Sequence, residues 1–243
     1  MLEAAPGLLV GLYILRRLDE NIAGSSWLTS QERSLLARDL VRAATAKKTG
    51  SVADVLREGR GWLACIIYFC AMTGLYGVSF WLPTIISELG FHRPFSIGLL
   101  AAIPYTFAGL GMIFVGRSAD RRGKLRWHVT IAALVGALGL ALSALFSHQA
   151  PLAMIALTCA TFGILSVPPL FWGLPTAYLH GSAAAAGIAV INSFGCLAGF
   201  ASPYLVGWIK DASGSTNAGM YLVAAVMLVG AVLVMVVFPS SSE

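Results

Sequence analysis

The chain has 243 residues, of which 58% are hydrophobic and only 11% are charged, and its mean hydropathy is +0.80. About a quarter of the residues of a soluble domain are charged, so this composition excludes an ordinary water-soluble protein. The net charge of +5 does not indicate a nucleic-acid partner, because fourteen of the sixteen Lys and Arg residues lie in segments 16–60 and 117–126, beside long apolar runs. That distribution is typical of the cytoplasmic loops of a membrane protein, which places the chain in a lipid bilayer.

The first apolar run covers residues 4–15 and is followed by Arg16 and Arg17. Twelve residues are fewer than the roughly 20 that a membrane helix needs. We therefore expect residues 1–15 to be the tail of a spanning helix whose beginning lies before Met1. An amphipathic membrane anchor is the alternative.

Residues 16–61 are polar, with nine Lys or Arg and six Asp or Glu. Thr29 and Glu32 have the spacing of a capping box, which predicts a helix through about Val41. Segment 51–54 repeats the signal ahead of a shorter helix. Because the region has too few apolar residues for a core of its own, we interpret it as a cytoplasmic linker.

Six long segments without charged residues follow, and they predict an all-α membrane bundle. They cover residues 62–87, 95–116, 127–147, 151–178, 183–208 and 218–238. The loops between them alternate in charge, with Arg93 and Lys210 as the two cations on the outer side. We therefore expect the bundle to span the inner membrane of the cell. The positive-inside rule predicts that the linker and the tail 239–243 face the cytoplasm.

The turn at residues 116–126 (GRSADRRGKLR) is the most basic stretch of the bundle region. It resembles the G-x-x-x-D-R-x-G-[RK] loop of the major facilitator superfamily of transporters, with Gly116, Asp120, Arg121, Gly123 and Lys124 at the matching positions. Segments 27–33, 76–83, 171–175 and 187–193 resemble the anion:cation symporter family within it. That family includes permeases for tartrate, phthalate and sugar acids.

The resemblance implies the C-terminal six-helix half of such a transporter, built of two inverted three-helix repeats. It implies proton-coupled symport of organic anions by alternating access, with the basic turn acting as a conformational latch. The chain would then be a truncated or split half that is inactive alone, and its missing partner is an N-terminal six-helix half. Cys196 departs from the family, which often has a second Asn there.

Four residues are candidate substrate contacts, because polar groups at membrane depth usually face a cavity or the bundle interior. They are Tyr76, Trp172, Asn192 and Ser193. The alternatives are that Asn192 bonds a neighbouring helix and that the two aromatic residues only pack. Gly195 and Gly199 form a G-x-x-x-G pattern, which predicts close helix packing.

Several kinds of chemistry are not expected. None of the six segments contains Asp or Glu. We therefore expect the N-terminal half to supply the titratable group for proton coupling and the cationic group that binds the anion. The cysteines lack metal-ligand spacing and the histidines fall at span ends or in turns, so we predict no metal, no cofactor and no enzyme. A non-transporting assembly or regulatory membrane protein is the alternative function.

Overall fold

The computed structural model of the chain describes residues 4–17, 25, 28–45, 59–177 and 182–238. It divides into two units, Met1–Lys48 and Thr49–Glu243. The first unit contains the helices α1 (Ala4–Arg17) and α2 (Ser30–Thr45). With 14 residues, α1 is about 21 Å long, which is shorter than the roughly 30 Å of a bilayer core.

The capping box predicted ahead of α2 is present. The Thr29 hydroxyl donates to Glu32 Oε2 at 2.7 Å, and the Thr29 backbone N–H donates to the same oxygen at 3.0 Å. These hydrogen bonds stabilise the ionised carboxylate and lower the pKa of Glu32 below its ordinary value. The predicted second cap at 51–54 lies outside the described residues.

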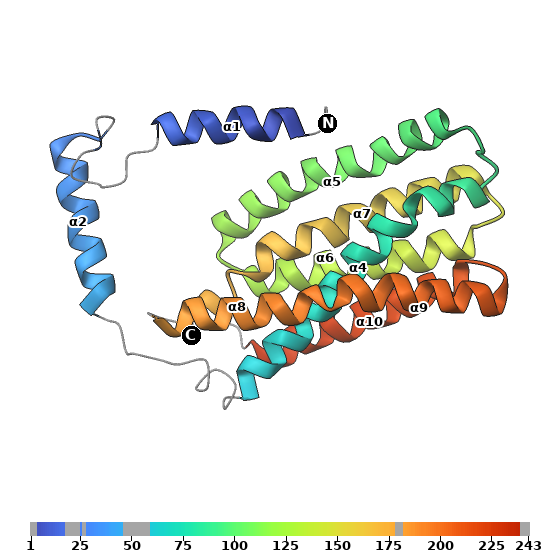
Figure 1. Cartoon of the computed structure of the whole chain (residues 1–243). Helices are drawn as coiled ribbons and strands as arrows, with labels where there is room; N and C mark the ends of the chain where they lie inside the picture. Colours follow the sequence, from blue (N-terminus) through green and yellow to red (C-terminus); the bar gives the residue numbers. More distant parts are fainter. Residues whose placement is uncertain (1–3, 18–24, 26–27, 46–58, 178–181, 239–243) are drawn as a thin grey trace. The chain divides into compact units, whose positions relative to one another are not determined.

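The second unit is a bundle of helices that are long and apolar enough to cross a membrane six times (Figure 1). Among its described residues every regular element is helical, which confirms the expected all-α membrane fold. The elements are α4 (Gly59–Glu88), α5 (Pro94–Arg122), α6 (Leu125–Leu145), α7 (Ala150–Phe171), the short 3-10 helix η2 (Pro175–Ala177), α8 (Ser182–Cys196), α9 (Ala198–Ser213) and α10 (Asn217–Val237).

Two of the expected segments are not single continuous helices. The helix α7 ends at Phe171, whereas the expected segment runs to residue 178. Pro168 and Pro169 cannot donate backbone hydrogen bonds, so the last turn is weakened and a 3-10 turn follows. The expected span 183–208 consists of α8 and α9, which meet at a turn around Leu197.

The centre of the bundle is packed through small residues on α6 and α7. A β-carbon at Gly139 would lie 2.4 Å from the backbone nitrogen of Ala160, and one at Gly163 would lie 2.4 Å from that of Gly136. Helices in lipid gain stability from such close contact, since lipid is as apolar as their side chains. These glycines therefore hold α6 against α7.

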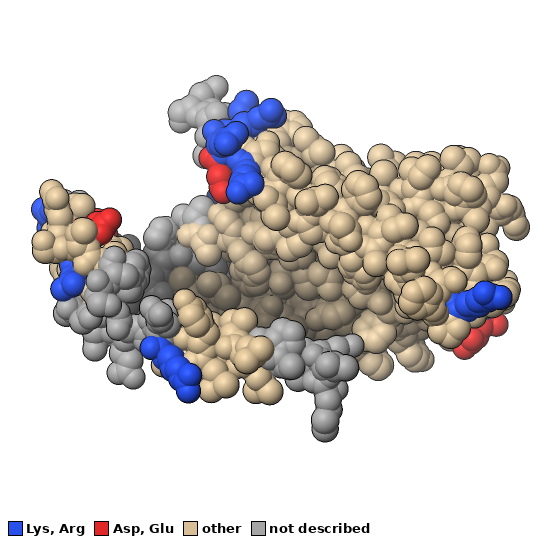
Figure 2. All heavy atoms as spheres, turned by 90° about the horizontal axis from the view of Figure 1, so that it is seen from above, with Lys and Arg blue, Asp and Glu red and all other residues tan. Residues whose placement is uncertain are grey.

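Charged side chains are confined to the ends of the bundle. On the face in Figure 2, its visible Lys, Arg, Asp and Glu residues lie at the two ends, with uncharged surface between them. Large apolar side chains such as Phe114, Ile131 and Phe200 are exposed along that length. This surface suits hydrocarbon, so the chain is a multi-pass membrane protein.

Candidate functional site

Aromatic side chains of α4 lie over glycines of α8 and α9. A β-carbon on Gly195 would lie 2.3 Å from Tyr68 Cδ1, one on Gly199 would lie 3.3 Å from Tyr76, and one on Gly207 would lie 3.4 Å from Trp81. Between these contacts the Ser202 hydroxyl donates to the backbone oxygen of Thr73 at 2.8 Å. The predicted packing role of Gly195 and Gly199 is therefore confirmed. We call this surface the α4–α9 seam.

Tyr68 is the centre of an aromatic cluster at one end of the seam. Its ring is stacked on Phe171 with centroids 4.8 Å apart, and it lies 4.9 Å from the ring of Trp172. The ring of Trp172 also packs edge-on against Phe171, with centroids 5.6 Å apart.

One predicted contact residue, Trp172, therefore adjoins a residue that the sequence analysis missed, Tyr68. Tyr68 precedes Tyr76 by eight residues on the same helix, a spacing that puts both on roughly the same side of α4. That spacing could have identified Tyr68. Its proximity to Trp172 depends on the packing of α4 against the end of α7, which the sequence does not display.

Asn192 and Ser193 lie elsewhere. Both are exposed on α8, while their neighbours Ile191 and Phe194 turn inward. Phe194 packs edge-on against Trp62, with ring centroids 5.8 Å apart. Within the described part of the chain, no hydrogen bond or ring contact joins Asn192 or Ser193 to the aromatic cluster.

The basic turn is mostly helical. Gly116, Asp120 and Arg121 belong to the last turns of α5, and Gly123 ends that helix in the left-handed conformation with φ of +63°. The Gly123 N–H donates to the oxygen of Ala119 at 2.9 Å, and Lys124 is the N-cap of α6. A glycine is required here because other residues rarely adopt this φ.

Asp120 does not serve the stability of its own helix. Negative charge is unfavourable near a helix C-terminus, where Arg121 and Arg122 are favourable. The carboxylate is exposed at the end of α5. Its position is therefore better suited to a partner on another element than to capping α5.

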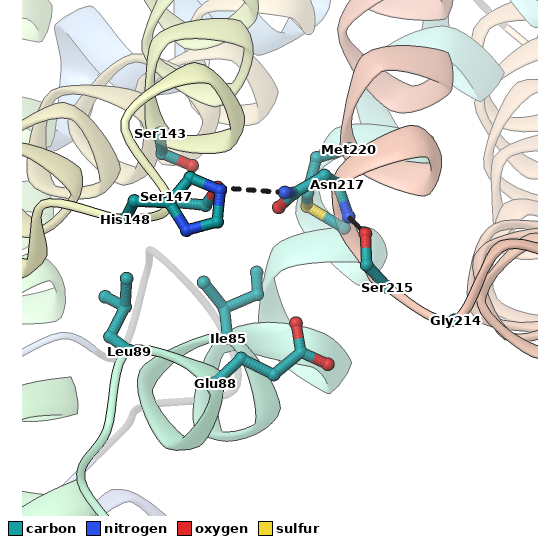
Figure 3. Close-up of a pocket in the computed structure, with 10 residues that line it drawn as sticks. All are labelled: Ile85, Glu88, Leu89, Ser143, Ser147, His148, Gly214, Ser215, Asn217 and Met220. Carbon is teal, nitrogen blue, oxygen red and sulfur yellow. Dashed lines mark hydrogen bonds between the residues drawn. The ribbon is translucent and has the colours of Figure 1, made fainter.

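A second polar site, which the sequence analysis also missed, lies at the opposite end of the bundle. Ten residues line a cavity of about 230 Å³ there (Figure 3), among them Glu88, Ser147, His148 and Asn217. Asn217 Nδ2 donates to Ser147 Oγ at 3.0 Å, which links α10 to the turn after α6.

Glu88 connects three helices beside this cavity. Its Oε1 lies 2.9 Å from Lys210 Nζ on α9, and it accepts a hydrogen bond from the Thr216 hydroxyl before α10. The Lys210 ammonium also lies 5.2 Å from the centroid of the Trp81 ring. We call Glu88, Lys210 and Thr216 the outer clasp. It holds the ends of α4, α9 and α10 together.

The side chains of the aromatic cluster and of the outer clasp are suited to binding and packing rather than to catalysis. Among the described residues there is no group of three or more His, Cys, Asp or Glu that could hold a metal ion. In the aromatic cluster Tyr68 and Phe171 are buried and Trp172 is half-buried, and the clasp offers an ion pair.

Comparison with known proteins identifies the family. The sequence model of the Major Facilitator Superfamily matches residues 1–203. A protein of Agrobacterium vitis named as a tartrate transporter is 38% identical over 100% of this chain and 54% of its own length. The inner membrane transport protein RhmT of Escherichia coli is 34% identical over 92% of this chain and 52% of its own length.

A metabolite transport protein of Pseudomonas putida, NicT, is 32% identical over 96% of this chain and 54% of its length. The chain thus spans about half the length of the relatives it matches. Among solved structures, the fucose:proton symporter of E. coli has the same fold, with a TM-score of 0.67 and 14% identity over 98% of this chain and 65% of that protein. The chain therefore belongs to the Major Facilitator Superfamily, a family of membrane transporters and not of enzymes.

Proposed function

We propose that this chain takes part in the transport of organic anions, carboxylates such as tartrate, phthalate or sugar acids, across the inner membrane of the cell. The observation that carries the proposal is the 38% identity along the whole chain to a protein named as a tartrate transporter. The proposed mechanism is proton-coupled symport by alternating access, in which helix bundles rock around a central site.

The six spans would form one half of the working transporter. The segments 62–87, 95–116, 127–147, 151–178, 183–208 and 218–238 contain no charged residue. Binding an anion in the membrane requires a cation or helix N-termini, and proton coupling requires a titratable group. We infer that a second, N-terminal half of six helices supplies both.

The surface for that second half would lie on α5 and on α8–α9. Only 17% of the span in α5 and 22% of that in α8–α9 is buried, against 39–61% for the other four spans. Lipid could cover such a surface, but the relatives have about twice the length of this chain, which favours a protein partner. Asn192 and Ser193 are exposed on this surface.

Within this proposal the substrate would lie between the halves. Tyr76 and Trp172 would offer aromatic faces, with the buried Tyr68 holding Trp172 in place, and Asn192 and Ser193 would offer hydrogen bonds from α8. The Asp120 carboxylate would act in the latch segment Gly116–Lys124 by binding a helix of the second half in one access state. Its unfavourable place at the C-terminus of α5 supports that role.

The proposed orientation follows the charges. The linker 16–61, the basic turn and the tail 239–243 would face the cytoplasm, and Arg93 and Lys210 the outer side.

Uptake into proteoliposomes tests the function. The chain would be purified alone and after co-expression with the N-terminal six helices of the A. vitis relative, and uptake of labelled tartrate would be measured under a proton gradient. We expect no uptake by the lone chain and uptake by the pair. Trp172→Phe should reduce uptake by the pair, whereas Trp127→Phe, at an exposed indole, should not.

Two results would contradict the proposal. Rapid tartrate uptake by the lone chain would refute the inference that the charged groups come from another half. A pair that assembles but transports none of tartrate, phthalate and sugar acids would refute the substrate class. Stable association of the lone chain with an unrelated full-length transporter would favour the alternative of an assembly or regulatory protein.

A further inference from the structure

A crevice between α5, α6 and α7 is not explained by the transport site. It has a volume of about 320 Å³ and lies near the end of the bundle that carries the basic turn. Its residues come from the last turns of α5, the first turns of α6 and the middle of α7. None of its lining residues is among the proposed substrate contacts, so a ligand here would be distinct from the transported anion.

The crevice has an apolar floor. Phe114, Ile131, Val135 and Phe162 contribute to it. Phe162 is held in place by Gly111, where a β-carbon would lie 2.5 Å from its ring. Phe114 and Ile131 are 65% and 55% exposed, so the floor is open along the side of the bundle. A hydrocarbon chain is the ligand that suits this part.

The mouth of the crevice is polar and basic. Arg122 lines it, as do Ser118 and His128, whose Oγ and Nε2 atoms lie 3.0 Å apart. His128 Nδ1 lies 2.8 Å from the backbone oxygen of Lys124, which can only accept, so this nitrogen carries a hydrogen. The histidine is thus held in place, and the Arg122 guanidinium is the charged donor at the mouth.

The mouth lies at the depth of lipid headgroups. Trp127, one residue before His128, is 46% exposed, and the Arg126 guanidinium lies 5.8 Å from the centroid of its ring. Exposed tryptophans beside basic residues are typical of the membrane interface. Segment 116–126 carries five basic residues and one acidic residue, a formal charge of +4 that attracts anionic headgroups.

We propose that this crevice binds an anionic phospholipid, with one acyl chain along the apolar floor and the phosphate held by Arg122. An arginine binds phosphate oxygens in a bidentate manner, and basic pockets between membrane helices are suited to anionic headgroups. The bound lipid fills the space between α5 and α6 beside the basic turn and stabilises the packing of these two helices.

Native mass spectrometry of the purified full-length chain tests the proposal. After incubation with an equal mixture of phosphatidylglycerol and phosphatidylcholine, the wild type should retain phosphatidylglycerol preferentially. Arg122→Gln should lower that retention about tenfold, as expected for the loss of a charged hydrogen bond. The matched control is Arg121→Gln, which removes the same charge from the neighbouring residue, outside the crevice. It should retain the lipid nearly as the wild type does.

The acyl chain needs its own test. Ile131→Trp should fill the crevice at a position already open to lipid, and it should lower phosphatidylglycerol retention without altering the basic turn. The apparent melting temperature in detergent should rise with added phosphatidylglycerol but not with glycerol 3-phosphate.

Four outcomes would overturn the proposal. Equal losses in Arg121→Gln and Arg122→Gln would show only diffuse attraction to the basic turn. Equal retention of the two lipids would exclude an anionic site. Unchanged retention in Ile131→Trp would exclude the acyl chain from the crevice. Stabilisation by glycerol 3-phosphate as strong as that by the lipid would indicate a site for a soluble anion.

Discussion

Gly195 lies directly beneath the ring of Tyr68, where a β-carbon would approach Cδ1 to 2.3 Å. The ring has no room to move away, because Phe171 and Trp172 pack against it at centroid distances of 4.8 and 4.9 Å. This contact sets the distance between α4 and α8. It also connects the G-x-x-x-G pattern with the aromatic residues proposed to face the substrate.

Gly195→Ala should therefore destabilise the bundle by about 1–3 kcal/mol, the usual range for an overpacked site. Gly199→Ala is the matched control, since its β-carbon would lie 3.3 Å from Tyr76, a contact that requires the ring to shift by only a few tenths of an ångström. The measurement is the apparent melting temperature of both variants in the same detergent. Equal melting temperatures would show that the seam adjusts to a methyl group and does not constrain α8.

Tyr68 and Trp172 should be energetically coupled. Tyr68→Ala and Trp172→Ala each remove the contact between the two rings, whose centroids lie 4.9 Å apart, so each change should cost about 3–5 kcal/mol. The double variant should cost less than the sum of the two, because the ring contact can be lost only once. Chemical unfolding of the four proteins measures the coupling. Additive costs would mean that the ring contact contributes no stability.

The outer clasp should contribute modestly to stability. Glu88→Gln removes the ion pair with Lys210 and weakens the hydrogen bond from Thr216, and we expect a loss of about 1 kcal/mol, because both charged side chains are partly exposed. Asp211→Asn, at an exposed neighbouring carboxylate, is the control and should have no effect. If Asp211→Asn lowered the melting temperature more than Glu88→Gln does, the proposed contribution of the outer clasp to stability would be wrong.

The start of α2 should depend on pH through Glu32. Hydrogen bonds from Thr29 lower the pKa of Glu32 in the folded state below 4.5, its value in an unfolded chain. The stabilisation is therefore present above about that pH and is lost as the pH falls through the lower folded pKa. Amide hydrogen exchange at residues 29–33, corrected for the intrinsic rate, should accelerate over this range.

Thr29→Ala should weaken this pH dependence, since it removes the side-chain donor and keeps only the backbone N–H. Asp39→Asn, at an exposed carboxylate later in α2, should leave it intact. If the pH profile of Thr29→Ala equals that of the wild type, the capping box is not its origin.

The proposed topology can be measured with single cysteines in a chain from which the four native ones have been removed. Lys124→Cys, in the basic turn, should react with a membrane-impermeant thiol reagent only after the cells are permeabilised. His92→Cys, exposed between α4 and α5, should react in intact cells. The reverse pattern would invert the orientation and the cytoplasmic assignment of the linker.

Much of this protein was predictable from the sequence, because its spans are set by local composition. The uncharged segments predict six membrane helices, since charge at membrane depth is too costly to place there. The pair Thr29 and Glu32 predicts the start of α2, since a capping box involves residues only three apart. The family could likewise be recognised from short motifs such as the basic turn.

The tertiary structure decided which side chains meet. It placed Tyr68 against Trp172, residues about a hundred positions apart, and it placed Glu88 against Lys210 and Thr216. It also left Asn192 and Ser193 exposed on α8, away from the aromatic cluster with which the sequence analysis had grouped them. Helix contacts in lipid depend on how small and large side chains fit together across the interface. No repeating pattern in the sequence reveals that fit.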